Sequence, residues 1–300
     1  MLTGIHILLT LKCTNECDHC FLHCSPSREA TFTIGQLRSL IDQIKQLGTV
    51  TIVYFEGGEP FLFYPLLLEG MRMVRADGFD AGIVTNGYWA VSVEDALIWL
   101  RPIRDLGIVD FSVSDDEFHR LNQDDRRAEF ARQAAQQLGI PTGTICIEAP
   151  SISRQSCEGD RGKPVIGGRV LFKGRAAEKL TAGVPVRACE EFTTCPHEDL
   201  LSPERVHVDA YGNVHLCQGL SIGNIWETPL RDLVCRFDAN KHPIVGPLLR
   251  SGPTGLAREH ELAMSDCYVD ECHLCYSARK LLLPRFPHYL APREAYGLQH

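Results

Sequence analysis

The stretch Cys13-Thr14-Asn15-Glu16-Cys17-Asp18-His19-Cys20 places three thiols within eight residues, directly after an apolar run from Ile5 to Leu11. The apolar run predicts the first strand of the fold. Three cysteines in one loop can hold a single metal centre, but a closed four-cysteine zinc or iron-sulfur site needs one more ligand. Either a distant residue completes the site, or one metal position stays open for chemistry.

The composition indicates a folded protein without a membrane span. The 300 residues are 44% hydrophobic and 23% charged, which allows a barrel-like α/β domain plus a small appendage. The net charge of -8 argues against nucleic acid as a partner, because phosphate binding needs a basic surface. No apolar run approaches the roughly 18 residues that cross a bilayer, and no secretory signal opens the chain. The sequence therefore predicts a cytoplasmic protein with no membrane partner.

The 13 cysteines fall into two groups. Disulfide bonds are a poor explanation for so many thiols in a chain without a secretory signal. Metal binding or redox chemistry explains them better. The simplest interpretation is one metal region near each end of the chain. The first group is Cys13, Cys17, Cys20 and Cys24; the second is Cys189, Cys195, Cys217, Cys267, Cys272 and Cys275; Cys146, Cys157 and Cys235 stand apart.

Apolar, β-branched segments alternate with segments of helical periodicity. Such alternation predicts a parallel α/β sheet, and six units predict a partial (β/α)6 barrel with its site at the carboxyl ends of the strands. The cysteine loop, Gly57-Gly58, Asn86 and Ser114 all fall at such ends. The predicted strands are 5–11, 50–55, 81–85, 108–114, 144–148 and 169–173, and the predicted helices are 34–47, 65–76, 92–106 and 126–138.

The second half of the chain has a different character. Residues 151–168 are rich in Ser, Gly, Arg and Asp and predict a loop. Residues 206–209 and 213–216 flank Ala210-Tyr211-Gly212 and predict a short hairpin that carries Cys217 just beyond its second strand. We therefore expect a small C-terminal domain that is stabilised by a bound metal.

The spacing Cys13-x3-Cys17-x2-Cys20 after the first strand, followed by Gly57-Gly58-Glu59-Pro60 after the second, resembles the radical S-adenosylmethionine (SAM) enzymes. The resemblance implies that the three thiolates hold a 4Fe-4S cluster whose open iron binds SAM. It also implies reductive cleavage of SAM to a 5'-deoxyadenosyl radical, which removes a hydrogen atom from substrate. The electron would come from a donor such as flavodoxin or ferredoxin.

The same resemblance implies a set of SAM-binding residues. His19 would contact the adenine, and the glycine turn with its Glu would bind the methionine amino group. Later strand ends would contact the ribose or carboxylate, although Ser112, Ser114 and Arg175 could instead be structural, and His119 could reach the substrate or begin a helix. The implied cofactor-binding residues are His19, Gly57, Gly58, Glu59, Pro60, Asn86, Ser112, Ser114 and Arg175.

The C-terminal cysteines resemble the SPASM or twitch auxiliary-cluster domain of that family. The resemblance implies one auxiliary 4Fe-4S cluster held by Cys195, Cys217, Cys272 and Cys275, while a zinc knuckle of the same four remains the alternative. It divides the chain into a radical SAM partial TIM barrel at residues 1–187 and an auxiliary-cluster domain with a C-terminal tail at residues 188–300. A free thiol could return a hydrogen atom to the substrate, and the candidates are Cys189, Cys157 and Cys267.

The expected function is hydrogen abstraction from a peptide, as in epimerisation or crosslinking of a ribosomal peptide. Dehydrogenation or rearrangement of a small metabolite is the alternative within the enzyme class. The alternative from another class is a non-catalytic binding protein in which Cys17-x2-Cys20 and Cys272-x2-Cys275 close one zinc site. A family member that keeps its cluster only as a scaffold is a third alternative.

Overall fold

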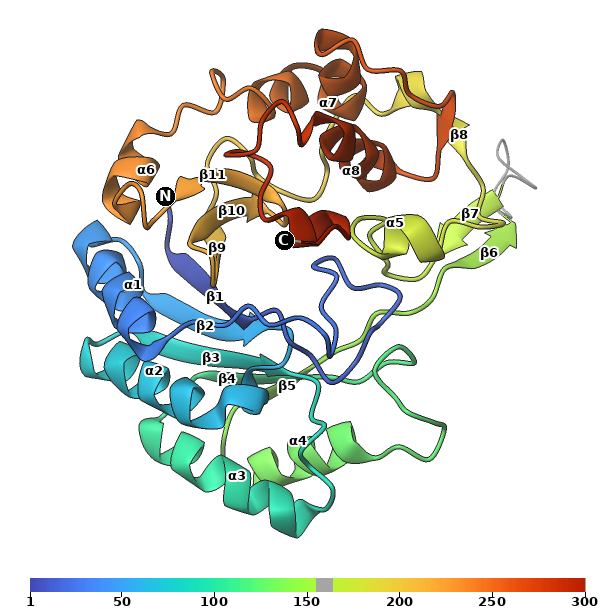
Figure 1. The fold of residues 1–300 in the computed structure, drawn as a ribbon. Helices are drawn as coiled ribbons and strands as arrows, with labels where there is room; N and C mark the ends of the chain where they lie inside the picture. The colour runs from blue at the N-terminus through green and yellow to red at the C-terminus, as the bar shows by residue number, and fades with distance from the viewer. Residues whose placement is uncertain (155–163, 300) are drawn as a thin grey trace.

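One eight-stranded sheet organises the molecule (Figure 1). The computed structural model describes residues 1–154 and 164–299. The strand order is β11-β10-β9-β1-β2-β3-β4-β5, and the strands from β9 to β5 in this order run parallel to one another. The bounds are β1 (Gly4–Thr10), β2 (Ile52–Gly57), β3 (Asp80–Thr85), β4 (Asp110–Ser114), β5 (Thr142–Ile145), β9 (Arg205–Asp209), β10 (Asn213–Cys217) and β11 (Leu220–Asn224).

Four helices cover the outer face of the parallel strands (Figure 1). They are α1 (Ile34–Leu47), α2 (Tyr64–Ala76), α3 (Val93–Leu106) and α4 (Arg127–Gln137). The predicted start of α1 is confirmed, because Thr33 caps the helix in a capping box with Gln36, and the helix ends at Gly48 with φ 70°. Its buried residues Leu37, Leu40, Ile41 and Ile44 join the main core.

The alternation of side chains along β1 separates the two faces of the sheet. Ile5, Ile7 and Leu9 belong to the main core beneath the helices, whereas Leu8 packs with Cys13 in a smaller inner cluster. The inner face of the barrel therefore leads directly to the cysteine loop.

The predicted fold class, a partial α/β barrel followed by a cysteine-rich C-terminal region, is confirmed, but the sixth parallel strand is not the predicted one. Residues 169–173 form no strand, and β9 pairs in parallel with β1 instead. Val206 and Val208 of β9 are almost fully buried in the same core as Ile5 and Ile7. Because this pairing joins segments about 200 residues apart, local sequence patterns could not distinguish it from a sixth βα unit.

The loop prediction for residues 151–168 is wrong in its described parts. β6 (Ser151–Arg154) and β7 (Pro164–Gly167) form an antiparallel pair, while residues 155–163 lie outside the description. The polar composition that suggested a loop is also compatible with a two-stranded ribbon away from the core.

The predicted C-terminal hairpin is confirmed, and it extends the barrel sheet. β10 pairs antiparallel with β9, with Val214 opposite Val208. The division of the chain at residue 188 stays a prediction, since β9 to β11 share a sheet with β1. The remaining elements are η1 (Pro60–Phe63), α5 (Ala176–Lys179), β8 (Arg187–Ala188), η2 (Cys189–Glu191), α6 (Leu230–Arg236), α7 (Val245–Glu259), β12 (Cys267–Tyr268), α8 (Glu271–Leu282) and η3 (Arg293–Tyr296).

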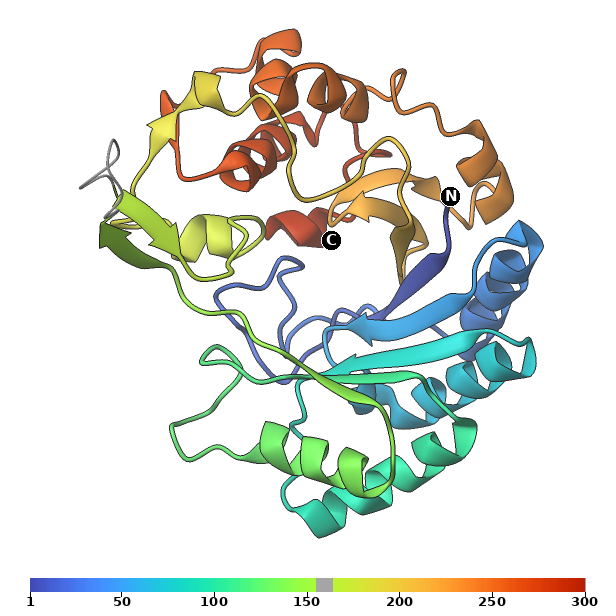
Figure 2. The ribbon, with the colours of Figure 1, turned by 180° about the vertical axis from the view of Figure 1, so that it is seen from behind.

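The C-terminal tail returns to the middle of the molecule. Figure 2 shows the C-terminus between α5 and the hairpin of β9 and β10. Tyr296 of η3 is fully buried, and the guanidinium of Arg28 donates to the carbonyl of Leu298. The tail therefore packs against both the C-terminal region and the segment that follows the cysteine loop. Within the described residues, no helix has the length and apolar character needed to cross a membrane.

Candidate functional site

A cavity of about 270 Å³ lies at the carboxyl ends of the parallel strands. The structure brings the three motif cysteines to its wall together with side chains from the ends of β2, β3 and β4. The predicted convergence of these strand ends is thus observed. Of the residues predicted from sequence, those that line the cavity are Cys13, Cys17, Cys20, His19, Gly57, Gly58, Asn86 and Ser114.

The two glycines after β2 allow close packing against the chain that enters the cysteine loop. The amide of Gly58 donates to the carbonyl of Thr10 at 2.7 Å, and the amide of Glu59 donates to the carbonyl of Lys12 at 2.9 Å. Gly57 has φ 127°, and a Cβ atom at Gly58 would lie 2.1 Å from the Lys12 oxygen. Glycine is required here because no side chain fits between the two backbones.

Glu59 links the glycine turn to the end of β3 from a fully buried position. Its carboxylate accepts hydrogen bonds from the amide of Asn86 at 2.7 Å, the hydroxyl of Thr85 at 2.9 Å and the amide of Phe61 at 3.0 Å. Burial raises the pKa of Glu59 to about 7 despite these donors. Neither Glu59 nor Pro60 is among the described residues that line the cavity. A contact between Glu59 and the SAM amino group therefore stays a prediction.

Asn86 orients the first motif cysteine. Its Nδ2 atom lies 3.6 Å from Sγ of Cys13 and donates to the hydroxyl of Thr14 at 2.9 Å. The amide of Asn15 also donates to Sγ of Cys13, at 3.5 Å. Burial nevertheless raises the pKa of the Cys13 thiol to about 12, so a bound cation would be needed to hold the thiolate.

The predicted serines differ in their positions. Ser114 lines the cavity, whereas Ser112 is outside the described lining and its hydroxyl donates to the carboxylate of Asp110 at 3.1 Å. The structure thus keeps Ser114 as a candidate for SAM contact and gives Ser112 a partner within the sheet.

Arg175 holds the backbone of the cysteine loop. Its guanidinium donates to the carbonyl of Cys17 at 2.6 Å and to that of Cys24 at 2.9 Å, and its amide donates to the carbonyl of Cys20 at 2.9 Å. The preceding Gly174 has φ 61° and allows this close approach. Arg175 is buried and is not among the described cavity-lining residues, so its predicted contact with the SAM carboxylate stays a prediction.

Arg175→Met is expected to destabilise the protein by about 3 kcal/mol, because two buried carbonyls lose their charged donor. The melting temperature and the iron content should both fall, and Arg175→Lys, which keeps the charge and one donor, should fall less. Unchanged melting with weaker SAM binding in the iron-loaded variant would contradict the backbone role and support the predicted SAM contact.

Two cavity residues were not assigned to the site from sequence. Cys24 lines the cavity, and its thiol donates a hydrogen bond to Cys20, which lowers the pKa of Cys20 to about 6 and raises that of Cys24. His119 also lines the cavity, and its Nδ1 lies 2.7 Å from the carboxylate of Asp116. The only sequence signals were the four-residue spacing from Cys20 and the position of His119 soon after β4.

The two cavity histidines have opposite electrostatic environments. Burial lowers the pKa of His19 to about 4, and its ring packs against Phe118 and His119 at 4.6 and 5.1 Å. For His119, burial is outweighed by Asp116 and Cys17, which raise its pKa to about 10. At neutral pH the cavity thus offers one uncharged imidazole for stacking and one cation.

The predicted hydrogen-donor cysteines lie elsewhere. Cys189 and Cys267 are neighbours, since the amide of Cys189 donates to the carbonyl of Asp266 and Cys267 pairs with Ala188. Neither is among the described residues that line the cavity, and Cys157 lies outside the described residues. A donor role for any of the three stays a prediction.

A second, small cavity of about 30 Å³ brings together the four cysteines predicted as auxiliary ligands. They are Cys195, Cys217, Cys272 and Cys275. Two buried cations, Lys173 and Arg279, also line it, and Nζ of Lys173 lies 3.5 Å from Sγ of Cys217. Burial disfavours the charge on Lys173, but the thiolates of Cys217 and Cys272 outweigh it and raise the lysine pKa.

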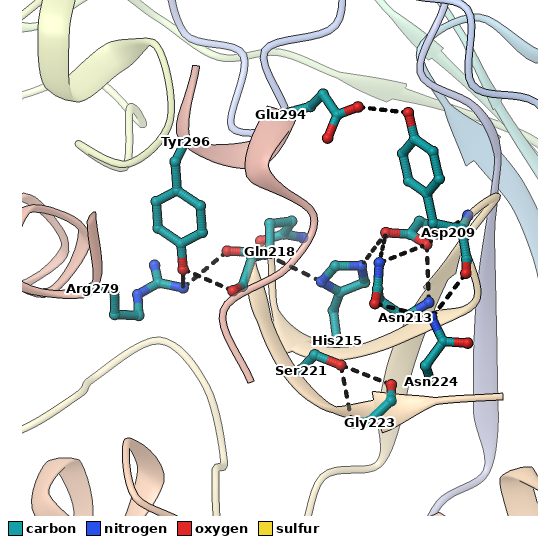
Figure 3. Close-up of polar contacts among 12 residues, drawn as sticks. Asp209, Asn213, His215, Gln218, Ser221, Gly223, Asn224, Arg279, Glu294 and Tyr296 are labelled. Carbon is teal, nitrogen blue, oxygen red and sulfur yellow. Dashed lines mark hydrogen bonds and ion pairs between the residues drawn. The ribbon is translucent and has the colours of Figure 1, made fainter. Parts of the chain in front are cut away.

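Figure 3 shows how polar contacts hold the turn after Cys217. The carboxylate of Asp209 accepts from Nε2 of His215 at 2.9 Å, and Nδ1 of His215 accepts from the amide of Gly219 at 3.2 Å. The carbonyl of Gln218 accepts from Arg279 at 3.0 Å. The hydroxyl of Tyr296 donates to the carbonyl of Gly219 at 2.7 Å. The hairpin and the C-terminal tail therefore position Cys217 jointly.

The geometry does not fit the predicted zinc site shared by the two cysteine pairs. Cys17 and Cys20 line one cavity, and Cys272 and Cys275 line the other. A tetrahedral zinc site with Zn–S bonds of about 2.3 Å needs sulfurs roughly 3.8 Å apart. In the described part of the chain, the candidate metal-binding groups with ligand atoms within 4.8 Å of one another contain no cysteine.

Residues 7–147 match the sequence model of the Radical SAM superfamily. YydG of Bacillus subtilis (strain 168), whose name proposes a role in peptide biosynthesis, is 27% identical over 115 residues, which cover 38% of this chain and 36% of YydG. An S-adenosylmethionine-dependent nucleotide dehydratase of Selenomonas ruminantium is 32% identical over 83 residues, 28% of this chain and 29% of the relative. The chain thus matches only about a third of the length of these relatives.

The crystal structure of BtrN in complex with AdoMet and 2-DOIA has a similar fold. It superimposes with a TM-score of 0.52 at 17% identity, over 78% of this chain and 82% of BtrN. Residues 7–147, which contain the cysteine loop and the glycine turn, are thus similar in sequence to the Radical SAM superfamily, and the chain is similar in fold to BtrN.

Proposed function

We propose that the protein is a radical SAM enzyme that removes a hydrogen atom from a carbon of a peptide. The observation that carries the proposal is the convergence of Cys13, Cys17 and Cys20 on one cavity beside Gly57 and Gly58. The three cysteines would hold a 4Fe-4S cluster. When bound, this cluster and SAM supply the 5'-deoxyadenosyl radical that abstracts the hydrogen atom.

The residues around the cysteine loop would prepare the site for that chemistry. Arg175 and the glycine turn hold the loop backbone, and Asn86 donates toward Sγ of Cys13. The uncharged ring of His19 suits stacking on a planar base, while the charge of His119 suits an anionic group. An external electron donor such as flavodoxin or ferredoxin would reduce the site.

A peptide substrate is supported by the similarity to YydG, and a small metabolite is the second candidate because the Selenomonas relative acts on a nucleotide. The test incubates anaerobic, iron-loaded protein with SAM and dithionite in D2O, with candidate peptides in one arm and nucleotides in the other. We expect peptide-dependent 5'-deoxyadenosine. A peptide mass gain of one deuterium would indicate epimerisation, and a loss of two hydrogens would indicate crosslinking.

If 5'-deoxyadenosine formed only in the presence of nucleotides, the substrate would be a small metabolite and the peptide proposal would be wrong. Iron-loaded, reduced protein that releases no 5'-deoxyadenosine in either arm would contradict catalysis and favour a scaffold role.

We further propose that Cys195, Cys217, Cys272 and Cys275 hold one auxiliary 4Fe-4S cluster. The four line one cavity, and buried Lys173 and Arg279 offset the charge of the thiolates there. The zinc knuckle alternative requires sulfurs roughly 3.8 Å apart, and the groups of close metal-ligand atoms among the described residues contain no cysteine.

Cys272→Ser is expected to lower the iron content from about eight to about four atoms per chain, since one of two clusters loses a ligand. Iron and sulfide analysis after anaerobic reconstitution measures the change. Cys235→Ser, which alters an exposed thiol, should keep the full iron content. Zinc in place of the lost iron, or wild-type protein with only four irons, would contradict an auxiliary cluster.

A further inference from the structure

Two histidines and a carboxylate meet on the inner face of the sheet, outside both cysteine sites. His6 of β1 lies directly opposite His207 of β9 and opposite Tyr54 of β2, and Glu56 follows Tyr54 by two residues on the same face. Three neighbouring parallel strands therefore each contribute one potential metal ligand. Glu56 also lines the large cavity, which places the group at the floor of the proposed active site.

The distances suit metal ligands that share one ion. Oε1 of Glu56 lies 3.3 Å from Nδ1 of His6 and 3.1 Å from Nε2 of His207. The ligand atoms of all three residues lie within 4.8 Å of one another. Ligands bound at about 2.1 Å to one ion are separated by roughly 3.0 to 3.4 Å in octahedral or tetrahedral geometry. These side chains thus need little movement to close on a metal.

One ring keeps a nitrogen without a partner. Nδ1 of His207 is buried and makes no hydrogen bond with any residue of 1–154 or 164–299, whereas Nδ1 of His6 faces the carboxylate of Glu56 at 3.3 Å. Two other buried histidines of this chain, His215 and His242, are well bonded, whereas Nδ1 of His19 in the large cavity also lacks a partner among the described residues. Nε2 of His242 contacts the carbonyl of Ser221, and its Nδ1 accepts from backbone amides, while His215 uses both nitrogens. Buried polar atoms are normally satisfied, so the open nitrogen of His207 leaves room for a ligand beside Glu56.

The charges of the group also favour a cation. The side chains of His6, Glu56 and His207 are only 19%, 16% and 9% exposed. Burial opposes ionisation of Glu56, but the two histidines outweigh it and hold the carboxyl pKa well below its usual range. Burial lowers the pKa of His207. The group thus places one carboxylate beside two imidazoles, side chains whose oxygen and nitrogen atoms are common ligands of divalent metals.

We propose that His6, Glu56 and His207 form a binding site for one divalent transition-metal ion. Two imidazoles and one carboxylate are a common ligand set for such ions, and three protein ligands leave coordination positions open. Because Glu56 lines the cavity, open positions on that side would be available to a water molecule or to a substrate oxygen. The site is independent of the cysteines, and its existence does not require the proposed hydrogen abstraction.

Mn(II) is the probe of choice, because it prefers oxygen and nitrogen ligands and competes poorly for thiolates. Anaerobic protein with its iron-sulfur clusters loaded and oxidised is titrated with Mn(II), and the free ion is followed by electron paramagnetic resonance. We expect one Mn(II) per wild-type chain. Glu56→Gln and His207→Ala should each weaken binding at least tenfold, while His288→Ala, which removes an exposed imidazole, should bind like wild type.

Iron content and melting temperature of each variant show whether it is folded. Glu56→Gln is nearly isosteric, so it tests the site if His207→Ala does not fold. Wild-type protein that binds no Mn(II), or a folded Glu56→Gln variant that binds it as tightly as wild type, would overturn the metal site and leave an ion-paired group that only packs the barrel.

Discussion

Cys17→Ala is expected to abolish formation of 5'-deoxyadenosine and to lower the iron content from about eight to about four atoms per chain. Cys17 is one of only three cysteines of the loop motif at the large cavity, and it is buried there. With two thiolates left, the loop cannot hold a cluster that needs three. The measurement is iron analysis together with chromatography of the SAM cleavage products.

Cys235→Ala is the matched control, because it removes an exposed thiol far in sequence from the motif. It should keep both the iron and the cleavage activity. If Cys17→Ala still released 5'-deoxyadenosine at the wild-type rate, the loop would not be the site of SAM cleavage. Retention of all the iron without cleavage would instead show that another thiol, such as Cys24 beside Cys20, can replace the ligand.

Gly58→Ala is expected to destabilise the protein by about 4 kcal/mol or more and to prevent cluster binding. The added Cβ atom would lie 2.1 Å from the carbonyl oxygen of Lys12 and 2.6 Å from its carbon. Neither atom belongs to a flexible side chain, so the glycine turn and the cysteine loop would have to separate. The hydrogen bonds from Gly58 to Thr10 and from Glu59 to Lys12 would be lost.

The readouts are the melting temperature, which should fall by about 10 °C, and the iron content. Gly35→Ala is the matched control, since Gly35 is an exposed residue of α1 with no atom within 4 Å of an added Cβ. Because alanine is a better helix former, this variant should gain a few tenths of a kcal/mol. Equal stability of Gly58→Ala and wild type would contradict the close packing of the turn on the loop.

Much of the barrel was predictable because its causes are local. The capping box of Thr33 and Gln36, the helical spacing of Leu37 to Ile44 and the apolar strand before Cys13 act within a few residues of one another. The sixth parallel strand was not predictable in this way. β9 pairs with β1 through contacts between Val206, Val208 and a distant core, while residues 169–173 had a strand-like composition and form no strand.

The candidate site shows the same division. Sequence spacing predicted that Cys13, Cys17 and Cys20 hold one centre, and the resemblance to the radical SAM enzymes added the glycine turn. The sequence did not show that Arg175 donates to the carbonyls of Cys17 and Cys24. That contact joins residues more than 150 positions apart, so it depends on the tertiary fold.

The sequence by itself predicted a radical SAM domain, the α/β class and the two cysteine groups, since these predictions rest on motif spacing and local periodicity. Only the tertiary structure decided which side chains meet. It brought the four C-terminal cysteines around one cavity, directed Cys24 and His119 into the other, and grouped His6, Glu56 and His207 from three strands. The register of neighbouring strands decides which side chains lie next to one another. That register depends on the packing of the whole core.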